Sequence, residues 1–321
     1  MLGYAPGMAA SSETRRIVVV GAGGVGSLLA AMLARSGNDV AMLARGTALG
    51  VIRERGIRVL GPETDDVVPI GRASDDPAEL GVADVVIVTV KTWQLAELAP
   101  RLVPLVGPHT IVVPLQNGVE ASEQLAPALG EDRVVGAVAR VISWVERPGE
   151  VRWIVAPSLT IGLRRPAPGD DIEACARTLR TGGIEVLIAA SIEPARWTKF
   201  LFIAPYAAVG AVERAPLGVI RSRPETRARL IAAMDEVAAV AAARGVAMPP
   251  DTAALMMQRL DNLPADATTS MHRDIVEGRP SELDQLIGAV VRLGREAHVA
   301  TPVSTALYAE LAPLERKARG A

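Results

Sequence analysis

Short runs of valine and isoleucine alternate with longer segments of helical period from Arg16 to about Ala190. This alternation is typical of a parallel sheet whose strands are joined by crossover helices. Residues 85–88 are apolar at every position, which suits a strand covered on both faces. We therefore predict an α/β, doubly wound parallel sheet for this half. Its expected strands are residues 17–20, 40–43, 85–90, 110–115 and 134–145, with residues 51–55 and 93–98 among the helices between them.

The strand signals end after residues 184–189, and the later sequence has helical period, as at residues 230–244, 270–277 and 283–298. Single hydrophobic cores stop growing near about 250–300 residues, so a chain of 321 residues favours two domains. We predict a flexible tail at residues 1–14, a sheet domain at 15–190 and an all-helical domain at 191–321. The stretch 164–171, with two prolines and a glycine, is expected to be a surface loop.

Composition narrows the partners and the location. A formal net charge of -2 gives no electrostatic attraction to nucleic acid or to anionic lipid, so we expect neither as a partner. The single cysteine, Cys175, cannot form an internal disulfide, and residues 1–16 lack the apolar centre of a signal peptide. A cytoplasmic location is therefore expected. The histidines His109, His272 and His298 lack the spacing of metal ligands, so no metal is predicted.

A glycine-rich loop, Gly21-Ala22-Gly23-Gly24-Val25-Gly26, follows the first predicted strand and opens a segment of helical period. The strand, loop and helix order is what a dinucleotide-binding fingerprint requires, although such a match alone is often an ordinary turn. Gly21 permits the tight turn, Gly23 lets backbone approach a pyrophosphate, and Gly26 lets helix and strand pack closely. The loop predicts a Rossmann-type domain that binds a dinucleotide.

Arg45 bears on which dinucleotide is bound. Enzymes that use NAD usually carry an acid at the end of the second strand, where it accepts a hydrogen bond from the ribose 2′-hydroxyl. Here that strand runs into Ala44-Arg45-Gly46, and a guanidinium there would bind a 2′-phosphate. The sequence thus favours NADP over NAD, with a solvated surface arginine as the alternative.

Three further segments, together with the glycine loop, resemble the ketopantoate reductase family. They are Val90-Lys91-Thr92-Trp93-Gln94, Leu115-Gln116-Asn117-Gly118-Val119-Glu120, and residues 270–302 with Ser270-Met271-His272-Arg273-Asp274-Ile275, Gly278-Arg279-Pro280-Ser281-Glu282-Leu283-Asp284 and Thr301-Pro302. The resemblance covers almost the whole chain. It implies a Rossmann domain followed by a helical domain, with NADPH-dependent reduction of a 2-keto acid to a 2-hydroxy acid in the cleft between them.

The resemblance also implies roles for particular residues. Lys91 and Asn117 would stand at strand ends beside the nicotinamide and the substrate, where open α/β sheets bind ligands. The alternatives are a solvated lysine at a helix start and, for Asn117-Gly118, a plain turn. Ser270 would donate to the substrate carboxylate or would cap the helix that follows it.

Lys199 is the predicted general acid, since it lies among bulky apolar residues at the start of the second domain. Low dielectric lowers the pKa of a lysine toward neutrality and makes it a better proton donor to a developing alkoxide. The alternative is a lysine that covers apolar surface while its ammonium stays in water. Glu282 is the predicted partner of Lys199, although Ser281-Glu282 also resembles a helix start.

Three positions depart from the family pattern, because Ile203, Ala207 and Ile287 stand where members typically carry asparagines. We expect these residues to line the substrate site and to favour a more apolar 2-keto acid, or another carbonyl or imine. The alternative of another class is a protein that binds NADP(H) as a sensor without turnover. Apolar helices in the second domain further suggest a homodimer.

Overall fold

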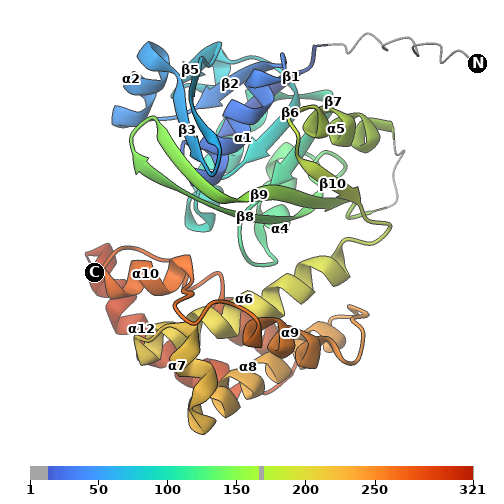
Figure 1. Cartoon of the computed structure of the whole chain (residues 1–321). Helices are drawn as coiled ribbons and strands as arrows, with labels where there is room; N and C mark the ends of the chain where they lie inside the picture. Colours follow the sequence, from blue (N-terminus) through green and yellow to red (C-terminus); the bar gives the residue numbers. More distant parts are fainter. Residues whose placement is uncertain (1–13, 166–169, 321) are drawn as a thin grey trace, which may run out of the picture.

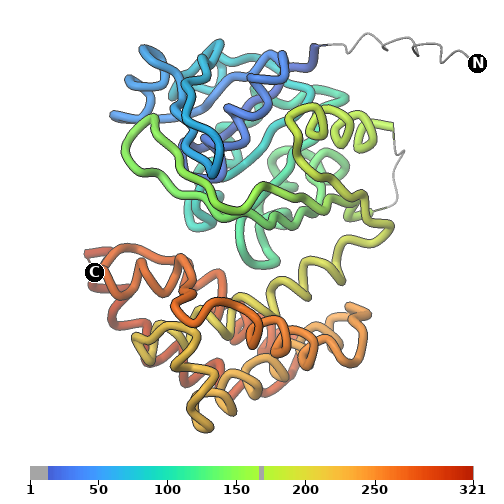
Figure 2. The backbone as a smooth tube through the Cα atoms, in the orientation of Figure 1, coloured from blue at the N-terminus to red at the C-terminus, as the bar shows by residue number. Residues whose placement is uncertain are grey.

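The protein consists of two domains, each with its own core, and its structure is a computed structural model that describes residues 14–165 and 170–320 (Figure 1). The tail predicted at residues 1–14 lies almost wholly outside the described residues, as does the centre of the loop predicted at 164–171. Figure 2 shows the chain passing from the sheet domain into the helical domain between strand β10 and helix α6.

A five-stranded parallel sheet forms the centre of the first domain, in the order β5-β2-β1-β6-β7. Its strands are β1 (Arg16–Val20), β2 (Asp39–Leu43), β5 (Arg72–Ser74), β6 (Ala83–Val88) and β7 (Val106–Pro114). Alternate residues of β1 enter different cores: Ile17 and Val19 pack on one face of the sheet, and Val18 and Val20 on the other. The prediction of a sheet covered on both faces is confirmed.

Helices cover both faces of this sheet. Helices α1 and α5 contribute to the core on one face, and α3, the 3-10 helix η3 and α4 contribute to the core on the other. The helical segments of this domain are α1 (Gly24–Arg35), α2 (Gly46–Arg55), η1 (Pro77–Glu79), η2 (Thr92–Gln94), α3 (Leu95–Leu98), η3 (Ala99–Leu105), α4 (Ala121–Leu129) and α5 (Asp170–Thr181). The helix predicted at 93–98 is therefore split into a 3-10 turn and a short α-helix.

A second sheet, which the sequence did not predict, packs across α1. It has the order β10-β9-β3-β4, and β8 pairs antiparallel with β9. Its strands are β3 (Ile57–Gly61), β4 (Thr64–Val68), β8 (Gly136–Arg147), β9 (Glu150–Gly162) and β10 (Glu185–Ile188). The expected strand 134–145 thus belongs to this sheet rather than to the central one. Its partner β9 has no clear strand signal, because Pro157 interrupts the apolar pattern.

The second domain is helical throughout its described length. Its helices are α6 (Glu193–Glu213), α7 (Leu217–Ser222), α8 (Pro224–Ala243), α9 (Thr252–Asp261), α10 (Ser270–Val276), α11 (Ile287–Glu296) and α12 (Pro302–Arg319). Helix α6 is buried along most of its length, and α8, α9, α10 and α12 all pack against it. Helix α11 starts four residues later than the predicted 283, because residues 283–286 form turns and Leu286 has a non-helical backbone with φ -103° and ψ -96°.

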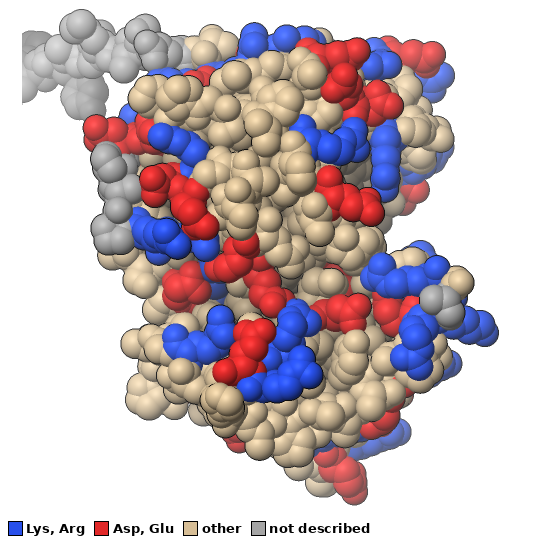
Figure 3. Space-filling model, turned by 180° about the vertical axis from the view of Figure 1, so that it is seen from behind, with Lys and Arg blue, Asp and Glu red and all other residues tan. Residues whose placement is uncertain are grey.

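The surface carries both signs of charge. Figure 3 shows basic and acidic side chains interspersed on the rear face of both domains. Among the described residues, no helix is both long enough and apolar enough to cross a bilayer.

Candidate active site

A cavity of about 2000 Å³ is lined by residues of both domains. The glycine loop, the ends of β6 and β7, and strand β8 contribute from the first domain, and α6 and the residues around α10 from the second. The position beyond the carboxyl ends of parallel strands is where open α/β sheets bind ligands. Ligand pockets for drug-sized molecules measure about 300–1,000 Å³, so this cavity has room for a dinucleotide together with a small substrate.

The glycine loop has the geometry of a phosphate cradle. Gly21 has φ +107°, and a Cβ added to Gly26 would lie 2.1 Å from the Gly21 carbonyl oxygen. By contrast, a Cβ added to Gly23 would meet nothing within 4 Å, so backbone is open to close approach there. Gly23 also caps the 12-residue helix α1 without a side-chain hydrogen bond, which leaves N–H donors of the first turn for an anion. These residues fit a dinucleotide diphosphate.

The other residues of the glycine loop either line the cavity or are buried beneath the loop. Ala22, Gly24 and Val25 line the cavity with Gly21 and Gly23, whereas Gly26 is buried beneath the loop. A Cβ added to Gly24 would lie 2.8 Å from the Ser143 carbonyl oxygen, so strand β8 passes directly over the loop. The cradle therefore has one wall from the first sheet and one from the second.

Arg45 lies where the second strand opens into the cavity. It is exposed, precedes α2 and lines the cavity. No hydrogen bond or ion pair joins its guanidinium to another residue within 14–165 or 170–320. The side chain is free to bind an anion at this end of the cavity.

Lys199 extends from the second turn of α6 into the cavity wall. Its Nζ donates a 2.9 Å hydrogen bond to the carbonyl oxygen of Ala139 on β8, in the other domain. Desolvation lowers the pKa of Lys199 to about 8, and the nearby Glu282 carboxylate opposes this shift. Arg140, the other charge that acts on this ammonium, lowers the pKa further. Lys199 is thus a partly buried lysine with a lowered pKa.

Glu282 reaches across the domain boundary in the opposite direction. It is 5% exposed, and its Oε1 accepts hydrogen bonds from Thr92 Oγ1 at 3.0 Å and Thr92 N at 3.4 Å. Asn117 Nδ2 donates to Oε2 at 3.4 Å. Thr92 and Asn117 follow β6 and β7, so the loops after two neighbouring strands hold one carboxylate. Lys199, Asn117 and Glu282 are thus brought together as expected.

The turn after Asn117 brings the two domains into contact. Gly118 has φ +98°, a backbone conformation that favours glycine. A Cβ added there would lie 2.8 Å from the Gln285 carbonyl oxygen, beside the Glu282 loop. Asn117-Gly118 therefore forms a turn, which was the alternative to a role in the site. The same turn also presents the Asn117 amide to Glu282.

Lys91 and Ser270 also line the cavity. The Lys91 ammonium pairs with Asp274 of α10 at 3.1 Å and lies 5.5 Å from the centre of the Trp93 ring. Ser270 is exposed, and Thr269 caps α10 instead by accepting a hydrogen bond from His272 N at 3.1 Å. Ser270 therefore does not cap α10, which was the alternative to binding the substrate carboxylate.

The three positions that depart from the family pattern separate in the structure. Ile203 lines the cavity, whereas Ala207 and Ile287 are fully buried in the core of the helical domain, away from the cavity lining. The expectation that Ala207 and Ile287 line the substrate site is not met. Residues four apart on a helix are rotated by about 40°, and residues eight apart by about 80°, so Ala207 turns away from the face of Lys199.

Sequence reasoning missed several residues of the site. Thr92 stands inside a quoted motif, but its part in holding Glu282 depends on the fold. Ala139 contributes its backbone carbonyl, a group that every residue has, so the sequence carries no signal for this role. Arg140 could have been found, because it is the charged residue in the otherwise uncharged run 134–145. Within the described residues, no group of three or more His, Cys, Asp or Glu is arranged to hold a metal.

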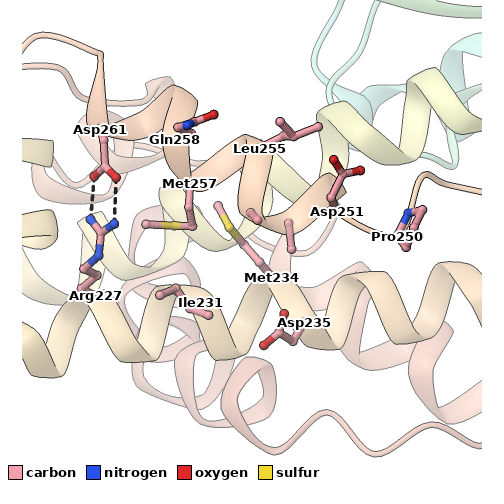
Figure 4. A pocket seen from close by; sticks show the side chains of 12 residues that line it. Arg227, Ile231, Met234, Asp235, Pro250, Asp251, Leu255, Met257, Gln258 and Asp261 are labelled. Atoms are coloured by element: carbon pink, nitrogen blue, oxygen red, sulfur yellow. Dashed lines mark hydrogen bonds and ion pairs between the residues drawn. The ribbon is translucent and has the colours of Figure 1, made fainter.

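A smaller cavity, of about 600 Å³, lies between α8 and α9 of the helical domain. Figure 4 shows Met234, Leu255 and Met257 in its walls, with Arg227 and Asp261 joined by paired hydrogen bonds at one end. None of the predicted site residues lines it. Lys199, Glu282 and Asn117 line the larger cavity instead.

Comparisons with known proteins identify the family of this chain. The family description "Ketopantoate reductase PanE/ApbA" matches residues 17–166, and its C-terminal counterpart matches residues 191–315. The chain belongs to the ketopantoate reductase family. It is accordingly an oxidoreductase, and the family resemblance seen in the sequence is confirmed.

Individual members of this family match over nearly the full chain. The 2-dehydropantoate 2-reductases of Halobacterium salinarum and Mesorhizobium japonicum are 31% and 28% identical. These matches cover 90% and 92% of this chain, and 95% and 96% of the two relatives. A crystal structure of a PanE/ApbA family ketopantoate reductase from Ralstonia eutropha has a TM-score of 0.87 at 29% identity, covering 95% of this chain and 99% of that one. The Rossmann domain followed by a helical domain is the fold of the family.

In this ketopantoate reductase family member, a buried carboxylate from the last helix supports the Glu282 loop. Glu315 accepts hydrogen bonds from Ser281 N at 3.0 Å and from Ser281 Oγ at 2.5 Å. Arg319 donates to Glu315 at 2.7 Å and to the Ser281 carbonyl at 3.0 Å, and its guanidinium lies 4.7 Å from the Trp93 ring centre. The residue before Glu282 is thereby held at its N–H, its hydroxyl and its carbonyl.

Replacing Glu315 with alanine is expected to lower the free energy of unfolding by about 2–4 kcal/mol, because buried donors of Ser281 lose their acceptor. Urea unfolding measures this loss. Glu310→Ala, in the same helix, removes a half-exposed carboxylate paired with Arg229 and should cost about 0–1 kcal/mol. Equal losses in the two variants would contradict the support assigned to Glu315.

Proposed function

We propose that this protein is an NADPH-dependent reductase that converts a 2-keto acid into the corresponding 2-hydroxy acid, with Lys199 as the general acid. One observation carries the proposal. The Lys199 ammonium, with a pKa of about 8, lies on the wall of the same cavity as the glycine cradle. A proton donor and a nucleotide cradle in one cavity are what carbonyl reduction needs.

Residues at two ends of the cavity would hold the cofactor. Gly21 to Val25 and the first turn of α1 would bind the diphosphate, and Arg45 would bind a 2′-phosphate. Lys91 and Asn117 lie beyond the ends of β6 and β7, on the side where the nicotinamide would lie. When bound, the cofactor supplies the hydride that reduces the carbonyl carbon.

Lys199 would supply the proton. As negative charge develops on the substrate oxygen, the ammonium can donate to it, and a pKa near 8 makes this transfer easier than from an ordinary lysine. The Ala139 carbonyl accepts one N–H of Lys199 and orients the ammonium, which leaves two N–H groups for other partners. Glu282 stabilises the protonated form and is itself held by Thr92 and Asn117.

A more apolar substrate than ketopantoate is the second candidate function, and Ile203 favours it. Its side chain lines the cavity one turn after Lys199, where family members typically carry an asparagine. Phe202 and Met256 also line this cavity. Substitution of an amide by an alkyl group removes hydrogen bonds to a hydroxylated ligand, so discrimination in favour of such a ligand is lost. Another carbonyl or an imine of similar polarity would fit the same wall.

The proposed acid predicts a particular dependence on pH. Reduction needs protonated Lys199, so kcat should be level below about pH 8 and fall about tenfold per unit above it. Lys199→Ala should remove this limb of the profile and lower kcat/KM for the best 2-keto acid by about 10²–10⁴. Steady-state rates of NADPH oxidation between pH 6 and about pH 10 measure both effects.

Lys317→Ala is the matched control, since Lys317 is an exposed lysine of α12 outside the cavity lining. It should leave the rate and the pH profile unchanged. Retention of the high-pH limb in Lys199→Ala would assign the proton to another group. Normal NADPH binding with no turnover of any carbonyl or imine would favour the sensor alternative.

Substrate preference is expected to follow Ile203. Branched or aryl 2-keto acids should have a higher kcat/KM than ketopantoate, and Ile203→Asn should shift that ratio toward ketopantoate by about tenfold or more. Ile231→Asn, a change in α8 outside the larger cavity, should leave the ratio unchanged. A clear preference of the unmodified protein for ketopantoate would refute the more apolar substrate.

The cofactor preference is expected to depend on Arg45. Arg45→Asp should lower the ratio of kcat/KM for NADPH over NADH by about 10–100-fold, because a carboxylate repels the 2′-phosphate that the guanidinium would pair with. Arg55→Asp, at the other end of α2, should leave the ratio as it is. An unchanged ratio in Arg45→Asp would remove Arg45 from cofactor selection. A homodimer and a cytoplasmic location stay predictions.

A further inference from the structure

Arg140 is a charged residue in the cavity to which the proposed mechanism assigns no contact. It follows Ala139, the residue whose carbonyl holds the Lys199 ammonium, and its exposed side chain lines the cavity. The β8–β9 ladder changes register between Arg140 and Ile142. Such irregularities re-aim side chains and are common beside active sites.

The other cations of the cavity wall are mostly engaged. Lys91 pairs with Asp274, Arg101 donates to the Asp75 carbonyl, Arg259 stacks on Phe202, Arg273 donates to Thr268, and Arg319 binds Glu315. Arg140 and Arg45 make no hydrogen bond or ion pair within the part of the chain that the structure describes. Arg45 follows β2, whereas Arg140 follows Ala139, whose carbonyl accepts the hydrogen bond from Lys199. The part of the cavity beside Lys199 and Ala139 therefore has a cation that is free to bind an anion.

Lys199 and the two charged side chains that act on it carry a net charge of one positive unit. Lys199 and Arg140 are both positive, and Glu282 is the acidic side chain that acts on this ammonium. The two oxygens of Glu282 already accept hydrogen bonds from Thr92 and Asn117. A bound anion beside Arg140 would offset the remaining positive charge.

Strand β8 distinguishes a substrate anion from the cofactor diphosphate. Ser143 and Trp144 of this strand lie against Gly24 of the phosphate cradle, whereas Ala139 binds Lys199. Arg140 directly follows Ala139 and is three residues before Ser143, with a change of register between Arg140 and Ser143. Arg140 therefore lies in the part of β8 that contacts the proposed general acid, Lys199, rather than in the part that contacts the phosphate cradle.

We infer that Arg140 binds the carboxylate of the 2-keto acid substrate. In a 2-keto acid the carboxylate carbon is bonded directly to the carbonyl carbon, so a partner for the carboxylate must lie beside the proton donor. A guanidinium can hold a carboxylate through two parallel hydrogen bonds, which orients the neighbouring carbonyl toward Lys199. The inference rests on the proposed reduction of a 2-keto acid. It adds the residue that recognises the carboxylate of this substrate.

The test compares a charged substrate with an uncharged one. Arg140→Gln should lower kcat/KM for the best 2-keto acid by about 10–100-fold and that for its methyl ester by less than about threefold. Arg140→Lys should recover part of the loss, because it restores the charge without the paired geometry. The dissociation constant of NADPH, measured by fluorescence, should be unchanged in both variants.

Arg147→Gln is the matched control on the same strand. Arg147 is 74% exposed, pairs with Glu150 and lies outside the cavity lining, so its replacement should leave the rates for acid and ester unchanged. Equal losses for acid and ester in Arg140→Gln would overturn the inference. Weaker NADPH binding with an unchanged KM for the acid would also overturn it, and would assign Arg140 to the cofactor.

A binding measurement separates this inference from the proposed reaction. Oxamate, a 2-keto acid analogue that resists reduction, should bind the NADPH-loaded protein, and Arg140→Gln should weaken its binding by about tenfold or more in calorimetry. If oxamate binds in this way while no 2-keto acid is reduced, the carboxylate site stands and the proposed reaction fails. If 2-keto acids are reduced and Arg140→Gln affects neither oxamate nor acid, only the carboxylate site fails.

Discussion

The site depends on two charges of the helical domain that find their partners in the sheet domain. Lys199 donates to the carbonyl of Ala139, and Glu282 accepts from Thr92 and Asn117. Removing such charges from water costs several kcal/mol for each ion unless hydrogen bonds compensate. Neither domain alone supplies these hydrogen bonds, so the charges are satisfied together only when the two domains are in contact.

Further contacts across the boundary hold the domains in that relation. Arg196, buried near the start of α6, donates to Glu123 of α4 at 3.0 Å and to the carbonyl of Val119. Arg292 of α11 pairs with Glu120, and Lys91 pairs with Asp274. In the helical domain these contacts come from three separate segments: α6, α10 and α11. Several contacts, each modest in energy, therefore set the positions of Lys199 and Glu282.

The fold could be predicted from the sequence where the determining interactions are local or periodic. The apolar runs 17–20 and 85–88 identify strands because both faces of the central sheet are covered. The second sheet could not be foreseen, since β9 carries Pro157 and pairs with β3, about 90 residues away in sequence, in a register that no local pattern specifies. Lys199 and Glu282 were identifiable as side chains, whereas the Ala139 carbonyl belongs to backbone and depends on how β8 is placed. Ile203 and Ala207 were expected on one face, and the drift of the helix separates them.

The unpredicted sheet contributes the element that links the parts of the cavity. Strand β8 lies against Gly24 at Ser143 and Trp144, and it binds the Lys199 ammonium at Ala139. Because one strand makes both contacts, the distance between the phosphate cradle and the ammonium is set within the sheet domain, including the change of register between Arg140 and Ser143. A hinge between the domains would leave that spacing variable. Because the ammonium is tied to the strand rather than only to its own helix, the helical domain presents Lys199 at a position that the sheet domain determines.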